Sequence, residues 1–310
     1  MNLLLCDIDI RENLLRRTGK LLDLLLIDHT SHKNIIWATD SHEMRGKEFA
    51  PNKQIKRELV TGQYSLLIQP RAVKSRVEQR QRTKDRGEVY TPLKIVNRMN
   101  KEVDKSGQFG NLDENNWKSY VRELKLEITC GEAPYIVSRY NPTSHTRKLR
   151  KLRRRVGFLD RKLRIVSRFC NEKEDWLAWA KEAYKSSYGY EWQGDNVLLA
   201  RENLLYTLTD FYKAQFGRHP SLSVKEEFAE IISWNIFQMD GLKYVIPMSC
   251  HHEPKVTPGE SALFWETPDT VEEFECEGCK FNRSTKHNGK YVRVMDWKRN
   301  KPIKFVNLLN

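Results

Sequence analysis

Apolar positions recur at helical spacing in three parts of the chain. Residues 11–29, "RENLLRRTGKLLDLLLIDH", place pairs of Leu between charged residues, a pattern typical of an amphipathic helix. Residues 173–187, "KEDWLAWAKEAYKSS", follow a similar spacing. Residues 188–212 begin as a strand that ends at Glu191 and then adopt helical spacing. We therefore predict a helix in each of these segments.

Short apolar segments predict β-strands elsewhere. They are "NIIWATD" at 34–40, "LKLEIT" at 124–129 and a strand within 230–247 that has Asp240 in the turn after it. The Gly and Pro of "CGEAPY" at 130–135 predict a turn that leads into a helix. A strand, a tight turn and a helix start are compatible with a ligand pocket at the strand's carboxyl end, although a plain strand-to-helix connection is the commoner explanation of such a pattern. Strands that alternate with helices predict an α/β fold.

One long segment lacks an apolar face. Residues 66–87, "LLIQPRAVKSRVEQRQRTKDRG", carry a cation every two to four positions and little apolar content after residue 73. We expect no face of it to pack on a core. It is either a solvated linker or helix, or an arm that contacts phosphates.

Composition narrows the class of partner. The chain has 310 residues, and its 54 Lys and Arg outnumber its 41 Asp and Glu, which gives a net charge of +13. A charge of this size favours a polyanion, most simply DNA. No apolar run approaches the roughly 18 residues of a membrane span, and Asp7 and Asp9 interrupt the opening segment as no signal peptide would. We expect a cytoplasmic protein with no membrane partner.

The densest positive charge lies between residues 147 and 155, where seven of nine residues are cationic. A solvated surface and a DNA-contacting arm both fit such a run, and the excess charge of the whole chain favours the arm. The predicted DNA-binding residues are Arg147, Lys148, Arg150, Lys151, Arg153, Arg154 and Arg155.

Cysteine spacing predicts a metal site near the C-terminus. Cys276 and Cys279 have the two-residue spacing of a zinc knuckle, in which an intervening glycine lets both thiolates converge on one ion. Cys250 is a natural third ligand, and the fourth is His287, His251 or His252. The alternative is a reduced surface pair with unrelated histidines. A structural zinc would stabilise a small module over residues 248–310, whose last strands would extend the main sheet or meet a partner.

Four segments stand in a suggestive order. They are "GEVYTP" at 87–92, "LEITCGEAPY" at 126–135, "YGYEWQGDNVLLARENLL" at 188–205 and "NIFQMDGL" at 235–242. Together they resemble the N-terminal, cofactor-binding half of the amino-type (N6-adenine) DNA methyltransferases, the proteins labelled restriction–modification subunit M. The likeness covers roughly residues 69–247.

The resemblance implies a Rossmann-like core that binds S-adenosylmethionine. It implies that Tyr90, Thr91 and Pro92 close over the methionine end of this cofactor. The family's glycine turn beneath the cofactor corresponds to residues 127–135, and Glu191 to the acid on the ribose, a role that its position after a second parallel strand also suggests. The implied cofactor-binding residues are Tyr90, Thr91, Pro92, Glu127, Thr129, Gly131, Ala133, Glu191, Trp192 and Asp240, the last contacting the adenine.

Two departures from the family pattern stand out. Ala133 occupies the position of a second glycine in the cofactor turn. The family's catalytic segment, (Asp/Asn/Ser)-Pro-Pro-(Tyr/Phe/Trp), does not occur in residues 239–310. That segment holds the target amine by hydrogen bonds so that its electron density is directed at the methyl group. The catalytic residues are therefore unknown from this sequence.

Three functional hypotheses follow. The first is an adenine-N6 DNA methyltransferase, or the cofactor-binding subunit of a split one, in a restriction–modification or phage-defence context; a second subunit would then supply the catalytic segment or specificity. The second is an inactive, methyltransferase-like DNA-binding or regulatory subunit. The third is a nuclease that uses the histidines and carboxylates near Cys250, although their spacing matches no nuclease motif. The expected organisation is a basic, mostly helical region at 1–86, a methyltransferase-like core at 87–247 and a zinc module at 248–310.

Overall fold

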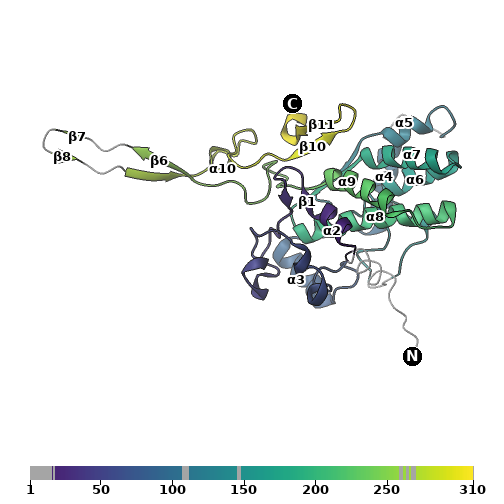
Figure 1. Ribbon diagram of the computed structural model, residues 1–310, viewed down its shortest axis with the longest axis horizontal. Coiled ribbons are helices and arrows are strands. Elements are labelled where there is room, and N and C mark those ends of the chain that lie inside the picture. The colour runs from purple at the N-terminus through teal and green to yellow at the C-terminus, as the bar shows by residue number, and fades with distance from the viewer. Residues whose placement is uncertain are drawn as a thin grey trace.

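The protein is a mixed α/β structure with a long projecting arm (Figure 1). The computed structural model describes residues 16, 18–106, 112–144, 148–257, 261–262, 265–266 and 270–309. The predicted α/β class is confirmed at this level. Arg147 of the basic run and residues 11–15 and 17 of the expected first helix lie outside the described residues. In the described part of the chain, no helix has the length and apolar character needed to cross a membrane.

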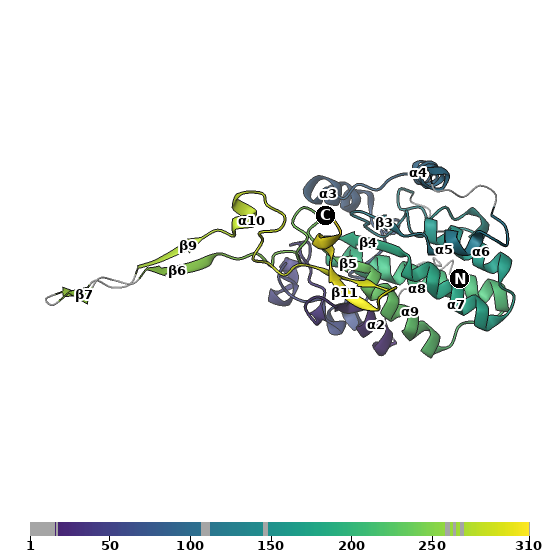
Figure 2. The same cartoon turned by 90° about the horizontal axis from the view of Figure 1, so that it is seen from above.

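A small parallel sheet determines where the functional site lies (Figure 2). Its strands stand in chain order, β3 (Lys125–Glu127), β4 (Ser187–Glu191) and β5 (Ile236–Gln238). The connecting helices are α6 (Phe158–Phe169) and α7 (Lys173–Lys185), then α8 (Gly194–Phe216) and α9 (Leu222–Asn235). Because all three strands are parallel, their carboxyl ends meet at one edge.

The helices pack around this sheet through apolar faces. In α7 the buried residues Trp176, Ala180, Ala183 and Tyr184 recur every three or four positions, so they form one face of the helix. Helix α8 is buried on almost every side. The predicted helices over 173–187 and after Glu191, and the strand that ends at Glu191, are confirmed.

The N-terminal region is less helical than predicted. Its elements are α2 (Gly19–Leu26), β1 (Ile27–Asp28), β2 (Lys33–Asn34), η1 (Glu43–Arg45), η2 (Lys47–Phe49), η3 (Arg57–Leu59), η4 (Gly62–Tyr64) and α3 (Arg76–Arg86). The predicted strand at 34–40 is reduced to β2 and a single bridge between Ile36 and Gln54. Buried Arg201 of α8 joins this region to the core, because its guanidinium donates to the carbonyls of Leu25, Ile27 and Ile236.

Helix α3 contradicts the expectation that its segment packs on nothing. Arg82 is buried and donates to Glu88 and to Asp195, the latter at the start of α8. Ser75 caps the helix by accepting from the backbone N–H of Glu78. The prediction considered apolar packing alone, whereas charge pairing holds one face of this helix against the core.

The predicted helix after the turn at 130–135 is also wrong. The chain continues in turns to residue 144, and the next α-helix is α6. The N–H groups of Tyr135 and Ile136 bond to Glu127, and the carbonyls of the same two residues accept from Phe158 and Leu159 of α6. These bonds occupy N–H and C=O groups of Tyr135 and Ile136 that would otherwise have been available to form a helix.

The remaining elements flank the sheet or extend from it. Before β3 come α4 (Leu93–Ser106) and α5 (Trp117–Arg122), and after it η5 (Leu152–Arg154). The projecting arm contains the paired strands β6 (Glu253–Thr257) and β9 (Thr270–Phe274), and β7 (Ser261–Ala262) and β8 (Trp265–Glu266) (Figures 1 and 2). The chain ends with α10 (Glu277–Lys280), β10 (Arg293–Asp296), β11 (Lys301–Lys304) and η6 (Phe305–Leu308).

The last strands neither extend the parallel sheet nor stand apart from it. Strands β10 and β11 pair only with each other in the described structure. Val292, Val294 and Phe305 nevertheless share a buried cluster with Tyr190 and Phe237 from β4 and β5. The C-terminal segment is therefore packed against the sheet by apolar contacts.

Candidate functional site

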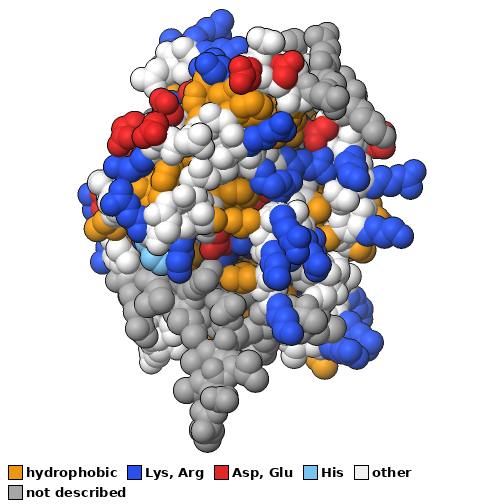
Figure 3. Space-filling view, turned by 90° about the vertical axis from the view of Figure 1, so that its right-hand side faces the viewer, with side chains coloured by type: hydrophobic (Ala, Val, Ile, Leu, Met, Phe, Trp, Pro, Cys, Tyr) orange, Lys and Arg blue, Asp and Glu red, His pale blue; other side chains and the backbone are white. Residues whose placement is uncertain are grey.

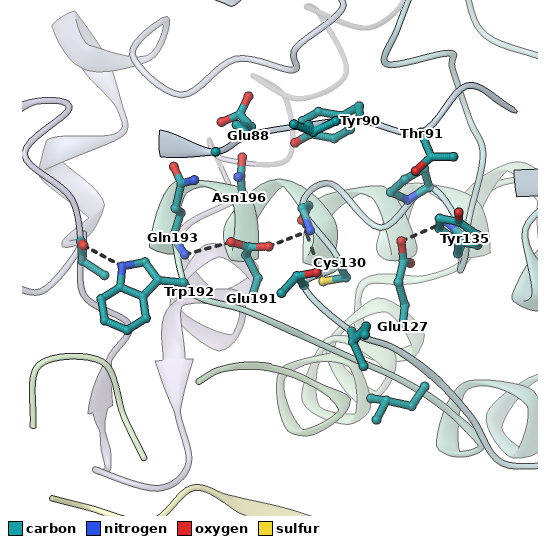
Figure 4. Close-up of a pocket in the computed structure, with 18 of the residues that line it drawn as sticks. Glu88, Tyr90, Thr91, Glu127, Cys130, Tyr135, Glu191, Trp192, Gln193 and Asn196 are labelled. Carbon is teal, nitrogen blue, oxygen red and sulfur yellow. Dashed lines mark hydrogen bonds between the residues drawn. The ribbon is translucent and has the colours of Figure 1, made fainter. Parts of the chain in front are cut away.

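A cavity of about 1120 Å³ opens at the carboxyl ends of β3 and β4 (Figure 4). Helix α4 and the loop that precedes it form another wall. Seven of the ten predicted cofactor-binding residues line the cavity, namely Tyr90, Thr91, Glu127, Thr129, Gly131, Glu191 and Trp192. The other three, Pro92, Ala133 and Asp240, do not line it.

Glu127, at the end of β3, holds the turn that forms the cavity floor. Its carboxylate accepts from the backbone N–H groups of Tyr135, at 3.2 Å, and Ile136, at 3.0 Å. Burial raises the pKa of this carboxyl well above its ordinary value, and the two hydrogen bonds oppose the shift. Glu127 thus connects the strand end to a segment eight and nine residues later.

Glu191, at the end of β4, connects the two strand ends. One carboxylate oxygen accepts from the N–H of Gly131 at 2.8 Å, and the other accepts from the N–H of Gln193 at 3.1 Å (Figure 4). Burial raises the pKa of Glu191, while these backbone donors lower it. The backbone N–H of Trp192 is a third donor to this carboxylate and also lowers its pKa.

The turn after β3 has an unusual backbone. Thr129, Gly131 and Ala133 all have positive φ, at 44°, 53° and 63°. Left-handed backbone is strained for Thr and Ala, and such strain is concentrated at functional sites in proteins. At Gly131 a Cβ atom would lie 3.0 Å from the hydroxyl of Tyr90 and 3.2 Å from its ring. Both its conformation and its close neighbour therefore favour glycine at this position.

Two buried polar atoms in the cavity wall have no hydrogen-bond partner within the described structure. They are Oδ1 of Asn196, in the first turn of α8, and the hydroxyl of Tyr90. Burial also raises the pKa of Tyr90 well above its ordinary value, and the nearby Glu132, Glu88 and Glu191 add to the shift. Unpaired buried polar groups are costly, so both atoms are suited to bonding with a ligand.

The sequence analysis did not identify Asn196 or the ion pairs that Arg82 forms with Glu88 and Asp195. Arg82 Nε lies 2.6 Å from Glu88 Oε2, and Arg82 Nη2 lies 2.9 Å from Asp195 Oδ2. Burial would raise the pKa of Asp195, but the Arg82 guanidinium holds it well below its ordinary value. The available signal was the position of Asp195 and Asn196 at the start of a predicted helix, just after a strand.

The three predicted residues outside the lining have local roles. Asp240 accepts from the N–H groups of Leu242, at 3.0 Å, and Lys243, at 3.2 Å, and so closes the turn after β5. Pro92 directly precedes α4, and its carbonyl accepts from Val96. Ala133 is buried and donates to the carbonyl of Cys130.

The C-terminal cysteines form a second candidate site. The ligand atoms of Cys250, Cys276, Cys279 and His287 all lie within 4.8 Å of one another. His287 Nδ1 lies 3.6 Å from the sulfur of Cys250 and 3.7 Å from each of the other two sulfurs. Tetrahedral zinc, with Zn–S of about 2.3 Å and Zn–N of about 2.0 Å, sets sulfur and nitrogen about 3.5 Å apart. The group could hold a metal ion, and its geometry is compatible with zinc.

The local fold selects His287 as the fourth ligand. A Cβ on Gly278 would lie 2.6 Å from the backbone and ring of His287, so the glycine lets the ring approach the cysteines. The N–H of His287 donates to the hydroxyl of Tyr291 at 2.8 Å. His251 and His252 are exposed and outside the group. The prediction of a four-ligand metal group that includes His287 is confirmed as a geometric possibility.

The basic run is divided between surface and interior. Lys148, Lys151, Arg153 and Arg154 are exposed, and Lys and Arg side chains gather over much of the face that Figure 3 shows. Arg150 is half-buried. Arg155 is buried, and its Nη2 lies 2.6 Å from Asp210, so it is held within the fold rather than on the surface.

Comparisons of the chain with protein-family models, with curated proteins and with solved structures found no match.

Proposed function

We propose that the chain binds S-adenosylmethionine in the cavity beside β3 and β4 and takes part in N6-adenine methylation of DNA. The observation that carries the proposal is the convergence of Tyr90, Gly131 and Glu191 on one cavity at the carboxyl ends of parallel strands. In open α/β sheets this edge is where nucleotide-like ligands bind. A three-stranded parallel sheet is compatible with the Rossmann-like methyltransferase core that the proposal requires.

The lining residues suit the parts of this cofactor. Backbone N–H groups of Gly131, Trp192 and Gln193 donate to Glu191, and a carboxylate can accept about four hydrogen bonds, so Glu191 can also accept from a ribose hydroxyl without losing its bonds to the turn. Asn196 Oδ1 and the Tyr90 hydroxyl are buried without partners and can bond to the ligand's amines or hydroxyls. When bound, the cofactor supplies an electrophilic methyl group, and the protein residues orient it.

The turn supports the same proposal. Ala133 stands where the family has a second glycine, and its φ of 63° is one that glycine adopts readily. A second glycine would thus fit the backbone conformation that Ala133 has here. Ala133 is buried behind the turn and outside the cavity lining, so this methyl group does not block the cavity.

We propose further that the chain is the cofactor-binding subunit of a split enzyme. Residues 239–310 lack the catalytic tetrapeptide, and in the described structure β3 pairs on one side only. Leu124, Leu126 and Ile128 beside that edge are 67%, 43% and 64% exposed. Parallel sheets are normally covered, so a partner strand that carries the catalytic segment is the natural complement. DNA would contact the exposed cations of the basic run.

A non-catalytic DNA-binding or regulatory subunit is the second candidate. The observation that favours it is the bonding of Glu191 to the turn and the packing of Tyr90 on Gly131, which stabilise the site without any ligand. In that case the chain binds DNA with a strong dependence on salt and does not bind the cofactor.

Calorimetric titration of S-adenosylmethionine into the purified chain tests the proposal. We expect micromolar binding that Glu191→Ala abolishes and that Asn196→Ala weakens about tenfold, as loss of one or two hydrogen bonds would do. Glu182→Ala, which removes a carboxylate outside the cavity, is the matched control. Absence of binding heat in the folded wild-type chain, with and without DNA, would leave the non-catalytic candidate.

The metal group has a separate proposed role. We propose that Cys250, Cys276, Cys279 and His287 hold a structural zinc ion. Four protein ligands complete a tetrahedral shell and leave no position for a substrate or a reactive water. The ion would connect the base of the projecting arm to the segment that packs on β4 and β5.

A further inference from the structure

A basic pocket of about 520 Å³ lies apart from the cavity, between α4 and α6. Three segments contribute cations to it: Lys101 from α4, Arg161 and Arg164 from α6, and the four arginines of the loop at 150–155. No carboxylate is among its lining residues. The pocket therefore concentrates positive charge from elements that are distant in sequence.

Two arginines that line this pocket each have a buried guanidinium nitrogen without a hydrogen-bond partner within the described structure. Arg155 is 3% exposed, and its Nη1 is buried without a hydrogen bond, although its Nη2 pairs with Asp210. Nε of Arg150 is also buried without a partner. A buried cationic donor that bonds to nothing is costly to fold, so it indicates a missing acceptor.

The neighbouring carboxylates do not balance the charge. Asp104 pairs with Arg161 but also with Lys125, and Asp210 pairs with Arg155 but also with Arg139. Asp160 is buried close by and accepts from the N–H groups of Ser138 and Gly157. Among the described residues, each of Asp104 and Asp210 is thus shared between a pocket arginine and a cation outside the pocket.

The arginines are also held in place by the backbone. Arg164 Nη1 donates to the carbonyls of Leu152, at 3.2 Å, and Arg155, at 2.9 Å, while Arg161 Nη2 bonds to Asn97. Burial lowers the pKa of Arg164 and of Arg150, and the nearby cations add to the effect despite Asp160. An anion would relieve both costs, and the side chains are already ordered to receive it.

We propose that this pocket is a binding site for a phosphate group. Guanidinium groups present planar pairs of donors that match phosphate oxygens, and several arginines around a hollow suit a group that projects into it. The phosphate could be free or terminal on a DNA strand, and the two sources share this chemistry. The inference does not depend on the cofactor cavity, which lies elsewhere on the chain.

The test compares two pairs of substitutions in the same loop. Arg153→Gln with Arg154→Gln removes two exposed charges that line the pocket, and Lys148→Gln with Lys151→Gln removes two exposed charges that do not. Both pairs change the net charge equally. All four side chains are exposed, so the substitutions leave the fold intact.

A second comparison uses helix α4. Lys101→Gln removes a pocket cation, whereas Lys94→Gln removes an exposed cation of the same helix outside the pocket. Binding of inorganic phosphate, and of a short single-stranded DNA with and without a 5′-phosphate, is measured by calorimetry at fixed ionic strength. The phosphorylated and unphosphorylated strands distinguish a terminal phosphate from the DNA backbone, and inorganic phosphate reports the free ion.

We expect saturable binding of one phosphate group per chain. The Arg153/Arg154 pair and Lys101→Gln should each weaken it about tenfold, because each removes charge-assisted hydrogen bonds. The two controls should change it less than about twofold, as remote surface charges do. Equal losses in both pairs would mean diffuse attraction and would overturn the proposal. So would the absence of saturable binding by every probe in the wild-type chain. Neither result would bear on S-adenosylmethionine binding.

Discussion

The metal group and the cavity are assembled in opposite ways. The metal group brings three cysteine sulfurs and one histidine nitrogen within 4.8 Å of one another, so the kind of ligand it suits, a metal ion such as zinc, follows from the donor atoms themselves. The cavity is formed around Glu127 and Glu191, whose carboxylates already accept from backbone N–H groups. The metal group needs an ion to bond its donor atoms, whereas the carboxylates of the cavity already accept hydrogen bonds from the backbone. Removal of a ligand should therefore affect the two regions to very different degrees.

The largest expected effect is loss of the metal group. His287→Ala should abolish zinc binding and unfold the segment around α10, because a structural zinc contributes about 10 kcal/mol or more of binding free energy to folding. Zinc content by mass spectrometry and a thermal melt measure both results. His252→Ala, which removes an exposed histidine outside the group, is the control. A His287→Ala protein that kept one zinc per chain would contradict the assignment.

The next effect tests the turn under the cavity. Gly217→Ala introduces a side chain at φ 69° in open space, so it should cost about 1 kcal/mol of unfolding free energy. Gly131→Ala has a similar φ but also meets Tyr90 at 3.0 Å, so it should cost about 1–2 kcal/mol more. Denaturant unfolding measures the difference. Equal costs at the two sites would mean that Tyr90 moves freely and does not close the cavity.

The two regions also differ in how far they follow from the sequence. The cavity residues at 90, 131 and 191 were predicted together because their segments stand in the order of the methyltransferase motifs that the sequence resembles, and the strand-end rule supported the last two. Asn196 was missed because the unpaired state of its oxygen depends on everything packed around it. The Arg82–Asp195 ion pair joins residues 113 positions apart, and neither periodicity nor composition contains that information.

The metal ligands were predicted by spacing for the two nearest cysteines and by chemistry for Cys250. The choice among three histidines needed the fold, because Gly278 and the Tyr291 hydroxyl bring His287 alone to the cysteines. The predicted helix after residue 135 failed for a related reason. A buried carboxylate at Glu127 captured the N–H groups of that segment, and side-chain capture of backbone donors is not visible in a hydrophobic pattern.

A smaller effect is the pH dependence of stability that Glu127, a buried carboxyl group of the cavity, should produce. Burial raises the pKa of Glu127 in the folded protein above its value in the unfolded chain. The folded state therefore holds this proton more tightly. Protonated Glu127 therefore contributes to the stability of the folded protein at low pH. This contribution declines as the pH rises above the ordinary pKa range of a carboxyl group toward the raised pKa of the folded state.

Glu127→Gln should accordingly flatten the dependence of unfolding free energy on pH above about 4.5, the ordinary carboxyl range. It should also cost about 1–3 kcal/mol, because the amide nitrogen of Gln is a donor and cannot accept from the second of the two backbone N–H groups. Urea unfolding at a series of pH values measures the slope. Glu114→Gln, at an exposed position, should leave the slope unchanged. A steeper slope in Glu127→Gln would mean that the hydrogen bonds outweigh burial and that the folded pKa is lowered.

The smallest expected effect lies beside the metal group. Lys243 Nζ lies 3.3 Å from the sulfur of Cys279, where a cation stabilises a thiolate ligand. Lys243→Met removes that donor and keeps a side chain of similar length, so zinc affinity should fall about tenfold in competition with a chelator. Lys290→Met, which alters a nearby lysine outside the group, should leave affinity unchanged. Because all four ligands remain, the protein should still fold with one zinc bound. A loss as large as that in His287→Ala would mean that the group depends on its neighbours as the cavity does, and the contrast between the two regions would fail.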